Sequence, residues 1–289
     1  MASYARVAAV TGGNKGVGLA CVRQLALQYP KSSFNSGPFL IYLTARNKER
    51  GERALQDIQQ DSQLKQAKVL KNDGGLTEVK YLPLDIDSSE SIKTFTDHIE
   101  KSHPKGIDFL INNAGIALDG FGPDIVKKTL HCNYYGTLNV TKQLLPHMVE
   151  GGRVVKVASM AGHIDSKYAP PIRKRFLQAT KVQQISELME EFSTAVEKNA
   201  YEGTWPGAAY KVSKAGVVGL TKTLAMESGD RVLINACCPG YVNTDMTKGR
   251  GKLSIDEGAQ LPVHLTLGDI QNSHGKFWRL GEIVNWERT

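Results

Sequence analysis

The chain has 289 residues, 41% of them hydrophobic, which is enough for one large α/β core or two small ones. Lysine and arginine number 36 against 29 aspartates and glutamates, so the formal net charge is +7. Basic and acidic residues are interleaved, and the densest basic run, Arg173 to Arg175, is short. This distribution favours a solvated surface and argues against binding to nucleic acid or to an anionic membrane.

Cysteine usage and the N-terminus indicate a protein of the cytosol. Of the four cysteines, Cys237 and Cys238 are adjacent in an apolar run, where their side chains would point to opposite faces of a strand. We therefore expect buried strand residues, neither reactive thiols nor part of a disulfide framework. No signal region precedes the apolar run at 7–10, and no stretch approaches the ~18 apolar residues that a membrane helix needs.

Short apolar runs alternate with longer segments of helical period along the chain. The runs predict strands over residues 7–10, 39–44, 79–84, 109–111, 153–158 and 232–238. Helices are predicted over residues 19–27, 88–99, 123–148 and 209–226, the second with a capping-type start at Ser88. Several runs are apolar without alternation, as in strands buried on both faces. The predicted fold is α/β, a Rossmann-type doubly wound, mostly parallel sheet with helices on both faces.

We expect a single domain over residues 1–289, with two inserted stretches. The first covers residues 31–38 and is rich in Ser, Asn and Gly. The second runs from about 165 to 205, where apolar residues recur at helical spacing: Ile185, Leu188, Met189, Phe192 and Val196. A helical insertion is therefore predicted there.

A glycine-rich turn over residues 11–18 follows the first predicted strand and leads directly into a helix. Glycines let the backbone approach a pyrophosphate, and the N–H groups at the helix N-terminus stabilise its charge. Gly-rich loops are common, but the order of strand, turn and helix predicts a dinucleotide site. Its expected residues are Gly12, Asn14, Lys15, Gly16, Val17 and Gly18.

The ends of the next two strands predict which dinucleotide binds. Folds that use NAD commonly place an acidic residue after the second strand, whereas Arg46 stands there in this chain. Arg46 can bind a 2′-phosphate with its planar fork, and Lys15 adds a second positive charge, so NADPH is expected. Asp85, followed by Ile86, is expected to lie beside the adenine amino group. A helix-capping role is the alternative, and it suits Asp87 better than Asp85.

Tyr210 and Lys214 are four residues apart in a predicted helix and therefore share one face. A tyrosine with its ordinary pKa of ~10 is a poor proton shuttle at neutral pH, and a nearby ammonium could stabilise its phenolate. Ser159 follows the fifth predicted strand, where it could orient a substrate oxygen. A tyrosine and a lysine at this spacing are also common on exposed helices, so the prediction depends on the other motifs.

Together these segments resemble the short-chain dehydrogenase/reductase family. Residues 112–115 are similar to its fourth-strand motif, and residues 239–244 to the turn after its sixth strand. The motifs follow the family's order from residue 11 to residue 244. The resemblance implies that the catalytic residues are Asn133, Ser159, Tyr210 and Lys214. It also implies cofactor contacts from Asn113, Tyr210, Lys214, Pro239, Gly240, Val242 and Thr244.

Within this family, residues 13–16, 44–46, 84–87 and 235–240 are similar to the cytosolic, monomeric carbonyl reductases that also reduce quinones. That resemblance implies that Asn133 holds a water in a proton relay through Lys214. A role of Asn133 in a helix kink is compatible with the relay. Thr244 would contact the nicotinamide carboxamide, and Asn113 would border the cofactor ribose.

Ser159, Met160, Tyr210, Tyr241 and Met246 are expected to contact the substrate, and their apolar members favour hydrophobic carbonyls. The segment between Gly115 and Asn133 varies among carbonyl reductases, so the resemblance implies no particular substrate contact from this segment. Tyr210 follows Ser159 by 51 residues, far more than in typical oligomeric members. The insertion between them could cover the surface used for assembly, and a monomer is expected.

The expected reaction transfers a hydride from NADPH to the carbonyl of a hydrophobic aldehyde, ketone or quinone, with Tyr210 as proton donor. One alternative is an NAD(P)-linked alcohol, hydroxysteroid or prostaglandin dehydrogenase, which Arg46 and Lys15 disfavour. The other is a protein that senses NADPH without turnover, which the complete catalytic set disfavours. No metal is expected.

Overall fold

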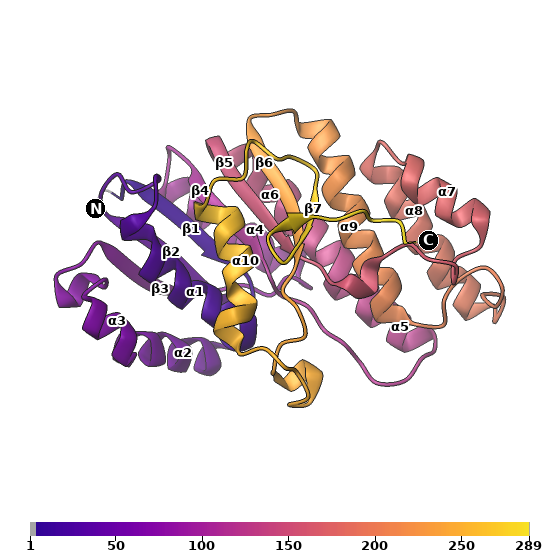
Figure 1. Cartoon of the computed structure of the whole chain (residues 1–289), viewed down its shortest axis with the longest axis horizontal. Coiled ribbons are helices and arrows are strands. Elements are labelled where there is room, and N and C mark those ends of the chain that lie inside the picture. The colour runs from indigo at the N-terminus through magenta and orange to yellow at the C-terminus, as the bar shows by residue number, and fades with distance from the viewer. Residues whose placement is uncertain (1–3, 289) are drawn as a thin grey trace.

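The computed structural model describes residues 4–288 as a twisted sheet between two layers of helices (Figure 1). Residues 1–3, on which the expected absence of a signal region partly depends, lie outside the described part. The eight strands follow the order β3-β2-β1-β4-β5-β6-β7-β8. Their bounds are β1 Arg6–Val10, β2 Phe39–Ala45, β3 Thr77–Pro83, β4 Ile107–Asn112, β5 Met148–Val157, β6 Val232–Cys238, β7 Phe277–Arg279 and β8 Glu282–Ile283.

Strand pairing is parallel from β3 to β7, and β8 pairs antiparallel with β7 at the edge. Strands with helices on both faces bury successive side chains in two different cores. In β1, Val7 and Ala9 belong to one core and Ala8 and Val10 to the other. This packing explains the non-alternating apolar runs and confirms the predicted doubly wound fold.

One face of the sheet packs against α1 (Gly16–Gln28), α2 (Lys48–Gln60), the short α3 (Ser62–Ala67) and α10 (Ile255–Leu267). The opposite face packs against α4 (Ser89–Ser102), α5 (Pro123–Leu130), α6 (Thr137–Leu144) and α9 (Ala209–Ser228). Two further helices, α7 (Pro170–Gln178) and α8 (Val182–Glu197), extend this second layer at one end of the molecule (Figure 1). No helix within residues 4–288 is long and apolar enough to cross a membrane.

The predicted helix over residues 123–148 is broken in the structure. Helix α5 ends at Leu130, a π-helical turn covers His131–Gly136, and α6 ends at Leu144. Met148 is already the first residue of β5. Apolar periodicity does not resolve a π turn, since the apolar face continues on both sides of it.

Three helices (α2, α3 and α10) and two strands were not predicted, and α3 has only six residues, of which Leu64 alone is buried. Helix α2 buries only Gly51, Ala54 and Ile58. Helix α10 contains a buried proline, Pro262, a residue type that usually ends a helix. Strands β7 and β8 have three and two residues, too few for a periodic signal.

The insertion at 165–205 contains α7 and α8, and its apolar stripe lies in α8. All five residues of that stripe are buried, and α8 packs against α9 and α5. Cys237 and Cys238 lie in different cores, which confirms that they point to opposite faces of β6. Both are free, buried thiols.

Candidate active site

A cavity of about 670 Å³ lies at the carboxyl ends of the parallel strands. Open α/β sheets bind their ligands at this edge. Most of the predicted site residues line it: Gly12, Asn14, Lys15, Gly16, Val17, Arg46, Asp85, Ile86, Asn113, Tyr210, Lys214, Pro239, Thr244 and Met246. Gly18, Asn133, Ser159, Met160, Gly240, Tyr241 and Val242 are not part of the lining as described.

The glycine turn depends on left-handed backbone at Gly12, with φ of +62°, and at Gly16, with φ of +56°. Gly18 is required for packing, because a Cβ there would lie 2.2 Å from the Gly12 carbonyl oxygen. The side-chain amide of Asn113 donates to the carbonyls of Thr11 and Gly12 at 3.0 and 3.1 Å. Asn113 therefore holds the turn in place while it also lines the cavity.

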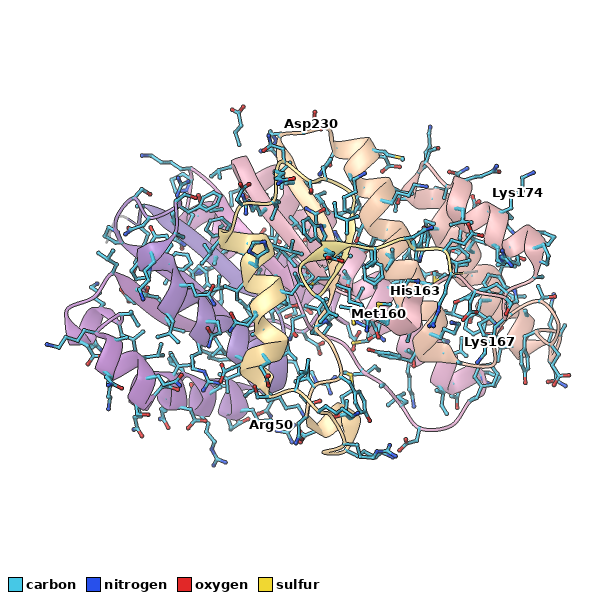
Figure 2. The ribbon with its side chains drawn as sticks, in the orientation of Figure 1. Arg50, Met160, His163, Lys167, Lys174 and Asp230 are labelled. Atoms are coloured by element: carbon cyan, nitrogen blue, oxygen red, sulfur yellow. The ribbon has the colours of Figure 1, made fainter. Side chains whose placement is uncertain are left out.

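Cationic side chains gather at one end of the cavity. Arg46 is 67% exposed, with its Nη1 atom 4.0 Å from Asp87 Oδ2. Lys15 Nζ lies 2.7 Å from Asp245 Oδ2, across the cavity. Arg50 is a third cation of the lining, on the first turn of α2, where the Asn47 side chain accepts from its backbone N–H (Figure 2). Three cations beside a helix N-terminus suit a phosphate.

Arg50 was missed in the sequence because helix α2 was not predicted. Its signal is the asparagine N-cap directly after Arg46, which starts a helix at the end of β2.

Asp85 and Asp87 follow β3, and both line the cavity. Asp85 Oδ1 accepts from the Asp87 N–H at 3.1 Å. The capping role suggested for Asp87 is wrong, since Ser88 caps α4 by accepting from the Ser91 N–H. Burial and the neighbouring Asp85 raise the pKa of Asp87. Within the described residues, Asp87 Oδ1 is buried without a hydrogen-bond partner, so an acceptor is left for a ligand.

Helix α9 brings Tyr210 and Lys214 to the cavity. Lys214 is buried, and its Nζ atom donates to the Val157 carbonyl at 2.7 Å and lies 5.7 Å from the Tyr210 ring centroid. Burial lowers the pKa of Lys214 to about 8. Burial also raises the pKa of Tyr210 to about 12, against the opposing effect of a hydrogen bond with Ser159. Burial therefore outweighs the hydrogen bond with Ser159, and Tyr210 carries its proton at neutral pH.

Ser159 lies two residues beyond the end of β5, with its Oγ accepting from the Ala161 N–H at 3.1 Å. The next residue, Met160, has its sulfur 3.3 Å from His163 Nε2 (Figure 2). Tyr241 and Met246 are 50% and 45% exposed, and Met246 lines the cavity. The cavity lining also contains three apolar residues from the segment between Gly115 and Asn133: Ile116, Ala117 and Leu118. The resemblance implied no substrate contact from this segment.

Asn133 lies in the π turn, and both polar atoms of its side-chain amide form hydrogen bonds. Its Oδ1 accepts from the Ile116 N–H at 2.7 Å, and its Nδ2 donates to the Ile116 carbonyl at 2.9 Å and to Ser213 Oγ at 3.0 Å. A Cβ on Gly115 would lie 3.1 Å from Asn133 Oδ1 and 3.6 Å from Lys214 Nζ. The Asn133 and Lys214 side chains therefore both lie against Gly115, which lines the cavity.

Known proteins are similar to this chain over nearly its whole length. The family model of the short chain dehydrogenases matches residues 6–171 and 198–253, and leaves out a stretch that holds most of α7 and α8. Carbonyl reductase (NADPH) 3 of Rattus norvegicus is 37% identical over 301 residues, covering 99% of this chain and 100% of the relative. Carbonyl reductase (NADPH) 1 of Homo sapiens is 35% identical over 300 residues with the same coverage.

Among solved structures, salutaridine reductase from Papaver somniferum is similar with a TM-score of 0.80 and 25% identity, covering 94% of this chain and 99% of its own. Menthone neomenthol reductase from Mentha piperita has the same fold, with a TM-score of 0.76 at 23% identity, and covers 97% of this chain and all of its own. The family model matches well over half of the sequence, and full-length relatives exceed 30% identity. This chain belongs to the short-chain dehydrogenase family.

Proposed function

We propose that this chain is an NADPH-dependent carbonyl reductase, which transfers a hydride from NADPH to the carbonyl of a hydrophobic aldehyde, ketone or quinone. The observation that carries the proposal is a single cavity with Tyr210 and Lys214 in one part and the glycine turn and three cations in another. The similarity to the carbonyl reductases of rat and human over 99% of the chain supports the same reaction.

The cavity fits a dinucleotide with a 2′-phosphate. The glycine turn offers backbone N–H groups to the pyrophosphate, and Arg46, Lys15 and Arg50 offer positive charge to the 2′-phosphate. The unpartnered buried oxygen of Asp87, together with Asp85 and Ile86, suits the adenine end. We place the ribose and nicotinamide beside the remaining proposed contacts: Asn113, Tyr210, Lys214, Pro239, Gly240, Val242 and Thr244.

Bound NADPH supplies the hydride, and the side chains orient and protonate the substrate. Tyr210 donates its hydroxyl proton to the carbonyl oxygen, and its pKa of about 12 keeps that proton in place until the oxygen becomes basic. Ser159 holds the same oxygen. Asn133 holds a water in a proton relay, and the proton that Tyr210 loses is replaced from solvent through this water and Lys214. Met160, Tyr241 and Met246 form the apolar side of the substrate site.

The remaining features of the proposal are a single domain, a monomer and a cytosolic location. The buried stripe of α8 covers the outer face of α9, which supports a monomer. Four buried, free cysteines suit a reducing compartment.

The test is the variant Tyr210→Phe, assayed with quinones, aromatic aldehydes, ketones and steroids, and with both NADPH and NADH. We expect the wild type to prefer NADPH, and kcat/KM of the variant to fall by roughly 10²- to 10⁴-fold because the proton donor is lost. NADPH binding, measured by fluorescence titration, should be retained. Tyr168→Phe is the matched control, since the buried Tyr168 hydroxyl has no partner among the described residues. Undiminished turnover by Tyr210→Phe would contradict the proposal.

A further inference from the structure

The segment that follows Ser159 is held between α9 and the C-terminal residues. On one side, Gly162 lies directly on the backbone of α9, since a Cβ there would be 2.7 Å from the Lys214 carbonyl. On the other side, Trp286 Nε1 donates to the Gly162 carbonyl at 2.8 Å. The Ile164 N–H donates to the Trp286 carbonyl at 3.1 Å. The backbone from Ser159 to Asp165 is therefore enclosed on two sides.

Lys211, the residue after Tyr210 on α9, ties this segment to the helix by its side chain. Its Nζ atom lies 2.7 Å from Asp165 Oδ2, and it also donates to the His163 and Ala161 carbonyls at 3.3 and 3.4 Å. The Lys211 side chain is only 15% exposed. An ammonium group has three donors, and here all three acceptors belong to one short segment.

The acceptors of Lys211 are coupled to Ser159 through the backbone. Ala161 gives its N–H to Ser159 Oγ at 3.1 Å, and Gly162 gives its N–H to the Ser159 carbonyl at 2.9 Å. Any shift of the segment relative to α9 would therefore move the Ser159 hydroxyl relative to Tyr210. Displacements of about 1 Å between reacting groups can cost a factor of about 10² in rate.

We propose that Lys211 is a positioning residue, which holds the segment 161–165 against α9 and so sets the distance between Ser159 and Tyr210. This inference rests on the proposed function, because Ser159 and Tyr210 act together only in carbonyl reduction. Lys211 is not part of the cavity lining as described, so its effect passes through Ser159 and not through contact with cofactor or substrate.

Helix α9 provides a matched control for this role. Lys222 also lies on α9, and its Nζ donates to the Leu177 carbonyl of α7 at 2.5 Å. It is partly buried like Lys211 and also bonds to a neighbouring segment, but that segment does not contain Ser159. A variant of Lys222 therefore loses a similar contact without the link to the site.

The experiment compares Lys211→Met, Lys211→Arg and Lys222→Met with the wild type. We expect Lys211→Met to lower kcat by roughly 10- to 100-fold with an aromatic aldehyde, while the Kd for NADPH changes less than about twofold. Amide hydrogen exchange over residues 159–165 should become faster. Lys211→Arg should restore most of kcat, because its guanidinium can still donate to these acceptors. Lys222→Met should lower Tm and leave kcat unchanged.

The exchange measurement separates failure of this inference from failure of the proposed function. Absence of carbonyl turnover by the wild type would overturn the proposed function, and with it the role of Lys211 in positioning catalytic groups. With an active wild type, unchanged exchange over residues 159–165 in Lys211→Met would overturn the inference. An equal loss of kcat in Lys222→Met would do the same.

Discussion

Lys156 is a fully buried lysine near the carboxyl end of β5, and its Nζ atom has no hydrogen-bond partner within residues 4–288. It lies on the face of β5 that carries Val154 and Ala158, in the core beneath α9. Burial lowers its pKa from the ordinary value of 10.5 to about 7. We therefore expect the free energy of unfolding to depend on pH through the protonation of this amine.

The sign of this link follows from the two pKa values. Between pH 7 and pH 10 the unfolded state binds the proton more tightly than the folded state, so the free energy of unfolding contributed by Lys156 rises with pH. Below pH 7 the whole cost of burying the charge is present, on the order of 5 kcal/mol for a pKa lowered from 10.5 to about 7.

Lys156→Met removes this cost and keeps the length of the side chain. We expect the variant to be more stable than the wild type at pH 7, with a gain that shrinks towards pH 10. Urea unfolding at several pH values measures it. Lys93→Met, on the exposed face of α4, serves as the control and should show no such trend. A gain for Lys156→Met that is the same at pH 7 and pH 10 would show that Lys156 is not neutral in the folded chain.

Most residues proposed for the site from the sequence line the cavity, but their chemical state was not predictable. Tyr210 and Lys214 share a helix face because of their spacing, and this required no tertiary information. The pKa of Tyr210 is raised because the surrounding chain buries the phenol. Burial of a side chain depends on every element packed around it, and no local pattern reports it.

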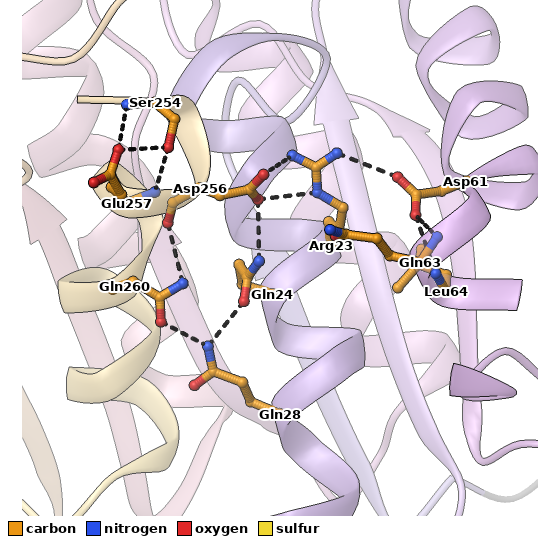
Figure 3. Close-up of polar contacts among 10 residues, drawn as sticks. All are labelled: Arg23, Gln24, Gln28, Asp61, Gln63, Leu64, Ser254, Asp256, Glu257 and Gln260. Carbon is orange, nitrogen blue, oxygen red and sulfur yellow. Dashed lines mark hydrogen bonds and ion pairs between the residues drawn. The ribbon is translucent and has the colours of Figure 1, made fainter. Parts of the chain in front are cut away.

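Helices α1 and α10 are joined by a network of polar side chains (Figure 3). Arg23 of α1 donates from Nε and Nη2 to the two carboxylate oxygens of Asp256 at 3.0 and 2.6 Å. A third donation, from Nη1 to Asp61 at 3.2 Å, reaches the residue that caps α3. Helix α1 starts at the glycine turn, and α10 follows the segment around Thr244, so the network fixes two walls of the cavity relative to each other.

Asp256→Asn removes the negative charge from this bidentate pair and keeps its shape. We expect the free energy of unfolding to fall by about 1–3 kcal/mol, the range for hydrogen bonds to charged groups. Chemical denaturation measures the loss. Gln260→Ala, which removes an exposed amide of the same network, should cost less than about 0.5 kcal/mol. Equal losses in the two variants would show that the pair adds nothing beyond a surface contact.

Elements were predictable where one face is strongly apolar. The four predicted helices all correspond to observed ones, although one of them is divided by the π turn at Asn133. Helix α2 was not predicted, because most of its residues are not buried. Arg50, which lies in α2 and lines the cavity, was therefore not among the predicted site residues. The missed helix α10 depends on tertiary packing to hold a proline inside it.

At the scale of the whole molecule, the insertion decides how much of α9 is left uncovered. Helix α8 packs along α9, where Met189 lies against Gly216 and Ile185 against Gly219. A helix face already covered by the same chain offers no apolar surface to a second copy. We therefore expect sedimentation and native mass measurements to give a single species near the chain mass of 31.6 kDa. A dimer or tetramer at micromolar concentration would contradict the proposed monomer.

The six longer strands, the glycine turn and the residues that follow each strand were predictable from local sequence patterns. These signals are local, because strand runs, turn glycines and helix spacing are set by neighbouring residues. In contrast, the contacts of Lys15 with Asp245, 230 residues away, and of Lys211 with Asp165, 46 residues away, were not predictable before the fold was known. Such pairs depend on how the layers pack around the sheet, and on the burial that this packing imposes on Tyr210 and Lys156.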